Sequence, residues 1–175
     1  MIRIFLIGYM GAGKTTLGKA LARAMGLTFV DLDWYIEERL HRTVSELFAE
    51  RGEAGFRELE RTMLHETGEF ENVVISTGGG APCFFDNVDY MNAHGLTVFL
   101  DVHPDILFRR LRVAKQQRPL LQQKNDDELR AFIASALFER DVFYRKARFR
   151  FDGSRLESRA QISESVRSLR TLLGV

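Results

Sequence analysis

The stretch Gly-Tyr-Met-Gly-Ala-Gly-Lys-Thr at residues 8–15 decides the fold, because it fits the pattern G-x-x-x-x-G-K-[ST] at every fixed position. An apolar run at residues 2–7 precedes it and is typical of a buried strand. Apolar residues at helical spacing follow it, from Leu17 to Ala24, and Gly26 marks the end of the predicted helix. The glycines therefore lie between a strand and a helix, which is the context that a phosphate-binding loop needs.

The residue types in this loop suit the phosphates of a nucleotide and a magnesium ion. Glycines let successive backbone N–H groups point inward at phosphate oxygens, and the following helix adds partial positive charge at its N-terminus. Lys14 would bridge the β- and γ-phosphates, and the Thr15 hydroxyl would ligate Mg²⁺. The alternative is a glycine turn that binds nothing, but it leaves the Lys and Thr of the pattern without a role.

The composition fits one soluble domain. The chain has 175 residues, which is enough for a single domain with a sizeable core. Its 25 Lys and Arg residues balance 24 Asp and Glu residues, which argues against a general nucleic-acid or membrane-surface binder. The sequence shows no signal peptide and no apolar run long enough to span a bilayer. The single cysteine, Cys83, fits a reducing cytosol and is interpreted as a small filler rather than a nucleophile. We therefore expect a cytoplasmic protein.

Four more apolar segments are predicted to be strands, and helices alternate with them. The strands lie at residues 27–31, 72–77, 97–102 and 149–152. One predicted helix starts at the capping box of Thr43 and Glu46 and runs to a break at Gly52. The other helices are predicted at residues 34–40, 55–68, 104–111, 126–137 and 158–173. This alternation predicts an α/β fold, a three-layer α/β/α domain with a five-stranded parallel sheet.

Two acidic residues and three glycines follow predicted strands, at the edge where parallel sheets bind ligands. Asp31 and Asp33 end the second strand, and side chains two apart on a strand point the same way. As an alternative, Asp33 merely caps the next helix. Gly78–Gly80 follow the third strand and permit a very close approach by another group, although a flexible turn is the other interpretation.

Residues 115–124 are polar and basic and are interrupted by a proline, which predicts a mobile flap over the site. Phosphoryl transfer to a small acceptor needs such a flap, because water would otherwise attack the γ-phosphate. The acceptor needs its own pocket. Arg57 and Arg140 suit a carboxylate, Asp33 suits a hydroxyl, and the N–H of Gly79 suits either. The residues therefore indicate a small, anionic, hydroxylated acceptor.

The sequence closely resembles the shikimate kinases along essentially its whole length. The phosphate loop at residues 8–16 is shared with many nucleotide enzymes, whereas Phe-Arg-Glu-Leu-Glu at 56–60 and the triple glycine within 76–81 are much more specific. Asp-Leu-Asp at 31–33, Arg-Pro-Leu-Leu at 118–121 and Glu-Arg-Asp-Val-Phe-Tyr at 139–144 add to the match. The resemblance implies phosphorylation of the 3-hydroxyl of shikimate by ATP, in a single P-loop kinase domain over residues 1–175. It also implies a lid at about residues 112–124 and substrate-binding helices at about residues 33–61.

The resemblance assigns a role to each candidate residue. The nucleotide is held by Gly11, Ala12, Gly13, Lys14, Thr15, Thr16, Arg112 and Arg118. One Mg²⁺ is held by Thr15, Asp31 and Ser76. Shikimate is held by Asp33, Arg57, Glu60, Gly78, Gly79, Gly80 and Arg140. Asp33, Lys14 and Arg118 are the catalytic candidates: Asp33 accepts the proton of the attacking hydroxyl, Lys14 neutralises charge, and Arg118 comes down with the flap. Arg112 lies near the position where the family stacks an arginine on adenine, and Glu60 orients Arg57.

One departure and two alternatives stand beside this interpretation. The family usually has a proline–leucine pair before the tyrosine that follows its last substrate arginine, whereas this chain has Val142-Phe143-Tyr144. Another kinase of this architecture, acting on gluconate or a nucleoside monophosphate, would not obviously need both Arg57 and Arg140. A non-catalytic nucleotide-dependent regulator would not need an intact acceptor site. We expect a monomer that binds ATP or ADP and shikimate, and neither nucleic acid nor membrane.

Overall fold

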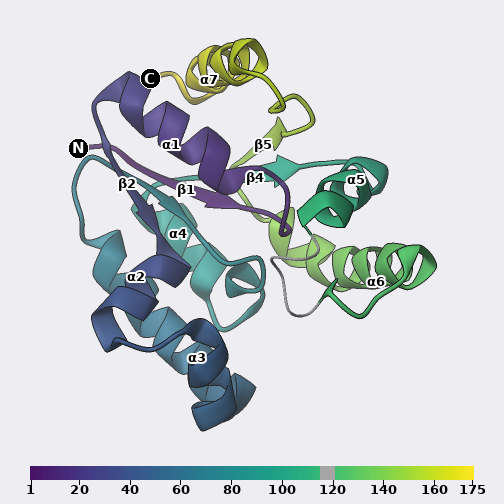
Figure 1. Cartoon of the computed structure of the whole chain (residues 1–175). Coiled ribbons are helices and arrows are strands. Elements are labelled where there is room, and N and C mark those ends of the chain that lie inside the picture. Colours follow the sequence, from purple (N-terminus) through teal and green to yellow (C-terminus); the bar gives the residue numbers. More distant parts are fainter. Residues whose placement is uncertain (115–120) are drawn as a thin grey trace.

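The structure is a computed structural model, and it describes residues 1–114 and 121–175. The sheet has five parallel strands in the order β2-β3-β1-β4-β5, with helices between them (Figure 1). The strands are β1 (Arg3–Ile7), β2 (Thr28–Asp31), β3 (Val73–Ser76), β4 (Leu96–Asp101) and β5 (Phe149–Asp152). The helices are α1 (Lys14–Met25), α2 (Leu32–Leu40), α3 (Val44–Gly68), α4 (Asn87–His94), α5 (Pro104–Ala114), α6 (Asp126–Tyr144) and α7 (Arg159–Leu173), with a 3₁₀ turn, η1 (Ala81–Cys83). The predicted α/β fold is confirmed.

The central strands are buried on both faces, which explains their nearly continuous apolar sequences. Every residue of β3 is buried, and so is every residue of β1 after Arg3. Helices α1 and α7 cover one face of the sheet and α4 covers the other (Figure 1). The core therefore fills both gaps between sheet and helices, and it leaves the carboxyl ends of the strands for the site.

Local sequence signals explain where most helices begin. In α1, Gly13 adopts φ 95° just before the helix, a conformation that favours glycine. The capping box at the start of α3 forms as predicted, because Thr43 and Glu46 each bond to the other's backbone N–H. The break at Gly52 is a kink inside α3, with φ 69° and ψ 177°, and helical residues continue on both sides of it. At α7, the Ser158 side chain accepts the N–H of Gln161 and caps the helix, while the Gln161 side chain accepts the N–H of Glu157.

Two short elements, η1 and α4, do not appear among the predicted elements. They follow the triple glycine, and neither has a stripe of apolar residues long enough to show a helical period. Instead, the side-chain amide of Asn87 donates to the carbonyl of Ala81 at 2.8 Å and holds the two elements together. A tertiary hydrogen bond of this kind leaves no pattern along the sequence.

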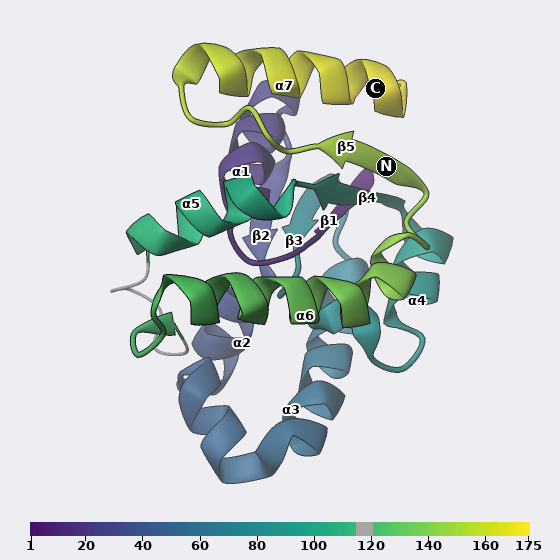
Figure 2. The same ribbon diagram turned by 90° about the vertical axis from the view of Figure 1, so that its right-hand side faces the viewer.

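Helix α2 and the first half of α3 project away from the sheet, below it in Figure 2. Helix α6 packs against α5 on the other side of the site. Residues 115–120, which include Arg118 and most of the predicted flap, lie outside the described residues. Within the described parts of the chain, no helix is both long enough and apolar enough to cross a membrane.

Candidate active site

The phosphate loop joins β1 to α1 and curls through three glycines with positive φ, at Gly8, Gly11 and Gly13. A Cβ on Gly8 would lie 2.8 Å from the carbonyl oxygen of Leu100 in β4, so only glycine fits there. The curl places the N-terminus of α1 at the carboxyl edge of the sheet, where its first N–H groups can meet an anion.

Lys14 lies buried against the inside of its own loop. Its Nζ donates hydrogen bonds to the carbonyl oxygens of Gly8 at 2.7 Å and Tyr9 at 2.9 Å. These two contacts hold the ammonium group within the curl of the loop. The charge is therefore positioned where the loop would receive a phosphate group.

Asp31 performs two tasks at the end of β2. Its Oδ1 accepts the N–H groups of Asp33 and Trp34, at 3.1 and 3.2 Å, and so caps α2. Its Oδ2 accepts the hydroxyl of Thr15 at 3.3 Å. The alternative in which Asp33 is the helix cap is therefore wrong, because Asp31 occupies that position. Asp33 lies in the first turn of α2, and its side chain lines the cleft.

Ser76 lies next to this pair because of strand register. At the carboxyl end of β3 it is opposite Asp31 on one neighbouring strand and Leu6 on the other. The hydroxyls of Thr15 and Ser76 and the carboxylate of Asp31 all line the same cleft. Hydroxyl and carboxylate oxygens are the ligands that Mg²⁺ prefers, so this donor set fits that ion.

A cleft of about 850 Å³ runs along the phosphate loop and the carboxyl ends of the strands. It is large enough for a nucleotide together with a small second molecule. On the loop side its walls include Thr16, Arg110, Leu111, Ala114, Leu156 and Glu157. On the other side they include Asp33, Trp34, Glu37, Val44, Gly78 and Gly79.

Asp33 sits in an environment that favours its neutral form. Burial raises the pKa of its carboxyl from 3.8 to about 6, and the charge of Asp31 adds to this effect. Lys14 and Arg57 pull the pKa in the opposite direction but more weakly. A carboxylate with a pKa close to neutral is suited to accept a proton, and a cationic ligand or metal nearby would stabilise its charged form.

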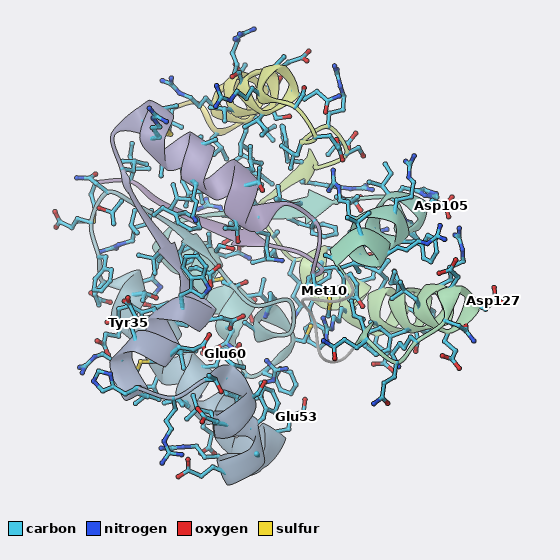
Figure 3. All side chains as sticks on the ribbon, in the orientation of Figure 1. Met10, Tyr35, Glu53, Glu60, Asp105 and Asp127 are labelled. Atoms are coloured by element: carbon cyan, nitrogen blue, oxygen red, sulfur yellow. The ribbon has the colours of Figure 1, made fainter. Side chains whose placement is uncertain are left out.

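Arg57 and Glu60 form an ion pair on α3, in the part of the helix near the sheet. The Nη1 of Arg57 donates to Oε1 of Glu60 at 2.9 Å, and Glu60 is only 1% exposed. Burial outweighs this pairing and raises the pKa of Glu60 from 4.5 to about 7. In Figure 3, Glu60 lies on the sheet side of α3, whereas Glu53 lies towards the far tip of the helix.

The three glycines after β3 make room for the charged side chains of the acceptor end. A Cβ on Gly78 would lie 3.2 Å from Oδ1 of Asp33, and one on Gly79 would lie 3.1 Å from Nη1 of Arg140. On Gly80 it would lie 2.6 Å from Nη2 of Arg57, which is too close. The groups that approach this backbone are therefore the charged side chains of Asp33, Arg57 and Arg140. A flexible turn does not account for the glycines.

Arg140 and Tyr144 reach the same loop from α6. Tyr144 donates its hydroxyl hydrogen to the carbonyl oxygen of Gly79 at 2.6 Å, and burial raises the pKa of this tyrosine above its ordinary value. The guanidinium of Arg140 lies 5.6 Å from the centre of the Tyr9 ring. Val142 is exposed on the outer face of α6. The unusual residues before Tyr144 therefore leave Arg140 beside Gly79.

On α5, the arginine that lines the cleft is Arg110 rather than the predicted Arg112. Arg112 is 62% exposed and forms an ion pair with Asp126 at 3.4 Å. Arg110 donates to the carbonyl oxygen of Gly11 at 3.1 Å and to that of Gly153 at 2.8 Å. Among the described residues that line the cleft, Arg110 is present and Arg112 is not. Helical spacing carries this signal, because Arg110 follows the inward-facing Leu107 by three residues.

Comparisons with known proteins point to one family. The sequence profile of the family described as "Shikimate kinase" matches residues 10–170. The shikimate kinase of Bacteroides fragilis is 69% identical over 175 residues, covering 100% of this chain and 98% of that protein. The shikimate kinase of Parabacteroides distasonis is 54% identical over 173 residues, covering 99% and 100%.

Solved structures agree with the sequence relatives. The crystal structure of shikimate kinase from Bacteroides thetaiotaomicron matches with a TM-score of 0.94 and 64% identity, covering 99% of each chain. Shikimate kinase from Acinetobacter baumannii in complex with shikimate matches with a TM-score of 0.84 and 31% identity, covering 99% of this chain and 94% of that one.

Proposed function

The chain belongs to the shikimate kinase family, and we propose that it transfers the γ-phosphoryl group of ATP to the 3-hydroxyl of shikimate in the cleft described above. One observation supports this function most strongly: Arg57, Arg140 and Asp33 converge on Gly78–Gly80 beside a phosphate loop. Two arginines suit one carboxylate, and the aspartate suits a hydroxyl. Shikimate carries both groups on a single small ring.

The loop side of the cleft is assigned to ATP. The backbone N–H groups of Gly11–Thr16 and the N-terminus of α1 would bind the phosphates, and Lys14 would leave its carbonyl contacts to neutralise charge on the β- and γ-phosphates. Arg110 and Leu156 line the part of the cleft beyond Gly13, so we assign the base to that region. Such an arrangement stabilises charge without covalent chemistry, which is what phosphoryl transfer mainly requires.

We propose that Thr15, Asp31 and Ser76 hold one Mg²⁺ with the nucleotide, directly or through water. The 3.3 Å hydrogen bond between Thr15 and Asp31 supports this assignment, because it already brings two oxygen donors together. When bound, the ion would neutralise charge on the phosphates. The protein's own contribution is to orient these three oxygens at the ends of β2 and β3 and at the start of α1.

The acceptor end is assigned to shikimate. Arg57 and Arg140 would bind its carboxylate from two different helices, and Glu60 and Tyr144 would hold the arginines and the glycine loop in place. Asp33 would accept a hydrogen bond from the 3-hydroxyl and aim it at the γ-phosphate. Because the transition state of phosphoryl transfer is loose, we expect this positioning to matter more than early removal of the proton.

One assay tests this function. ADP release is measured in the presence of Mg²⁺ and ATP with shikimate, with gluconate, with AMP and without an acceptor. We expect shikimate alone to give turnover well above the background without an acceptor. Turnover with gluconate or AMP instead would identify another small-molecule kinase, and ADP release that ignores every acceptor would leave only a nucleotide-dependent module.

We also propose that the protein acts as a cytoplasmic monomer. Its single cysteine suits a reducing compartment, and Asp33, Arg57 and Arg140 already converge on the glycine loop within one chain. Sedimentation equilibrium with and without ADP and shikimate tests the oligomeric state. A dimer whose dissociation lowers turnover would contradict the proposal.

A further inference from the structure

The guanidinium of Arg57 has one short hydrogen bond, to Glu60, and is otherwise held by the groups packed around it. Its side chain is 11% exposed, and its one short ion pair is to Glu60; the other, to Glu53, is 3.8 Å long. Its buried Nε has no hydrogen-bond partner among the described residues. Because a short hydrogen bond fixes only one corner of the guanidinium, packing against other groups must set its plane before it can receive a carboxylate.

Aromatic rings supply that fixation. The ring of Phe84 lies 4.3 Å from the guanidinium carbon, nearer than those of Phe56 at 5.5 Å and Phe48 at 5.6 Å. A guanidinium that stacks on a ring keeps its N–H edge free for a carboxylate. Phe84 is half-buried and follows η1, only four residues after Gly80.

The segment from Gly80 to Phe84 thus contacts Arg57 at both of its ends. Gly80 leaves a space that Nη2 of Arg57 occupies, since a Cβ there would lie only 2.6 Å away. Phe84 contributes a ring to the same guanidinium. One short segment therefore supplies the backbone near the acceptor and also sets the position of a side chain from α3.

We infer that Phe84 is a positioning residue for the acceptor: its ring stacks on Arg57 and holds the guanidinium in register with the carboxylate of shikimate. This inference rests on the proposed role of Arg57. It names a residue that is not among the described residues lining the cleft and that acts through the arginine.

The next residue provides a matched control. Phe85 also stacks on an arginine of α3, with its ring 5.2 Å from the guanidinium of Arg61. However, Arg61 is 41% exposed and pairs with Asp86 on the surface. The two neighbouring phenylalanines therefore make the same kind of contact, and only one of the contacts reaches the site.

Steady-state kinetics of Phe84→Leu, Phe84→Tyr and Phe85→Leu test the inference. Phe84→Leu is expected to raise the KM for shikimate about three- to tenfold, since a partly desolvated cation–π contact is lost. The KM for ATP and kcat are expected to change less than about twofold, because charge stabilisation at the phosphates is untouched. Phe84→Tyr keeps a ring and is expected to retain the wild-type KM, as is Phe85→Leu.

A double-mutant cycle separates a positioning role from a merely structural one. In an Arg57→Ala background, Phe84→Leu should add no further increase in the KM for shikimate, because its effect passes through the missing arginine. An additive effect, an equal rise in the KM for ATP, or the same change in Phe85→Leu would overturn the inference. If Phe84→Leu fails to fold, Phe84→Met is measured instead. A wild-type protein without shikimate turnover would contradict the proposed function itself, whereas an active wild type with an unchanged Phe84→Leu contradicts only this inference.

Discussion

The phosphate-binding part of the cleft is made mainly by one continuous segment, whereas the acceptor site beside it is assembled from side chains of three helices. At the first, Gly8–Thr15 supplies the curl, the lysine and the hydroxyl, and strand and helix fix their positions. At the second, Asp33, Arg57 and Arg140 come from α2, α3 and α6 and meet over the glycine loop. The two ends therefore differ in how far local sequence determines their geometry.

This difference predicts how each end responds to mutation. The nucleotide end relies on backbone dipoles and one buried ammonium, so the loss of that single charge should lower kcat strongly. The acceptor end divides its work among several side chains, so each loss should weaken a single contact. The predictions below test this division, from the largest expected effect to the smallest.

Lys14→Ala is expected to have the largest effect. ATP binding should weaken and kcat should fall by about a hundredfold or more, because the charge aimed at the β- and γ-phosphates is removed. The fold should survive, since Lys14 lies against the carbonyl oxygens of its own loop and does not belong to the hydrophobic core. Calorimetry with ADP and an ADP-release assay measure the two effects, and circular dichroism checks the fold. Normal turnover would show that the loop does not bind the transferred phosphates.

Asp33→Asn is expected to lower kcat by about a hundredfold while shikimate binding remains measurable. The amide keeps the size of the side chain and can still accept a hydrogen bond, but it cannot take a proton or carry charge. Asp33→Ala should lose both binding and turnover. Glu38→Gln on the exposed side of the same helix serves as the control. Because Asp31 already caps α2, a near wild-type kcat in Asp33→Asn would leave Asp33 without a catalytic role.

Arg57→Ala or Arg140→Ala is expected to raise the KM for shikimate about tenfold or more, since a charged hydrogen bond contributes ~1.5–3 kcal/mol. The affinity for ATP should change little. Arg61→Ala on α3 and Arg145→Ala just after α6 are matched controls, because both arginines pair with surface aspartates. Equal losses for ATP and shikimate would remove the distinction between the two ends of the cleft.

The same distinction explains what the sequence predicts well. The five parallel strands and the phosphate loop follow from contiguous patterns, so their positions agree closely with the structure. Asp33 and the glycines could be placed at the correct edge of the sheet, because strand ends are local features. The sequence could not show whether Asp31 or Asp33 caps α2, because the two carboxylates lie two residues apart and either one can cap a helix.

Features that depend on distant segments left weaker signals. The choice of Arg110 over Arg112 depends on which face of α5 meets Gly11 and Gly153, and several arginines follow one another there. The contact between Phe84 and Arg57 joins residues 27 positions apart, and Phe84 directly follows η1, an element that is not predicted. Sequence spacing alone carries no information about such a contact.

Glu60→Gln gives the smallest predicted effect, and it appears in stability rather than in turnover. Burial raises the pKa of Glu60 from 4.5 to about 7, so the folded protein holds a proton that the unfolded chain releases. This contribution is fully present below about pH 4.5 and is lost as the pH rises through about 7. Glutamine cannot titrate, yet its carbonyl oxygen can still accept the hydrogen bond from Nη1 of Arg57.

The free energy of unfolding, measured by urea denaturation between pH 4.5 and pH 8, tests this prediction. The stability of the wild type relative to Glu60→Gln should fall by about 1 kcal/mol or more across that range, since one pKa unit corresponds to ~1.4 kcal/mol. Glu53→Gln on the exposed part of the same helix is the matched control for the substitution. If the wild type instead gains stability relative to Glu60→Gln as the pH rises, then the attraction of Arg57 outweighs burial. Glu60 would then be ionised beside the positive charge of Arg57 rather than protonated.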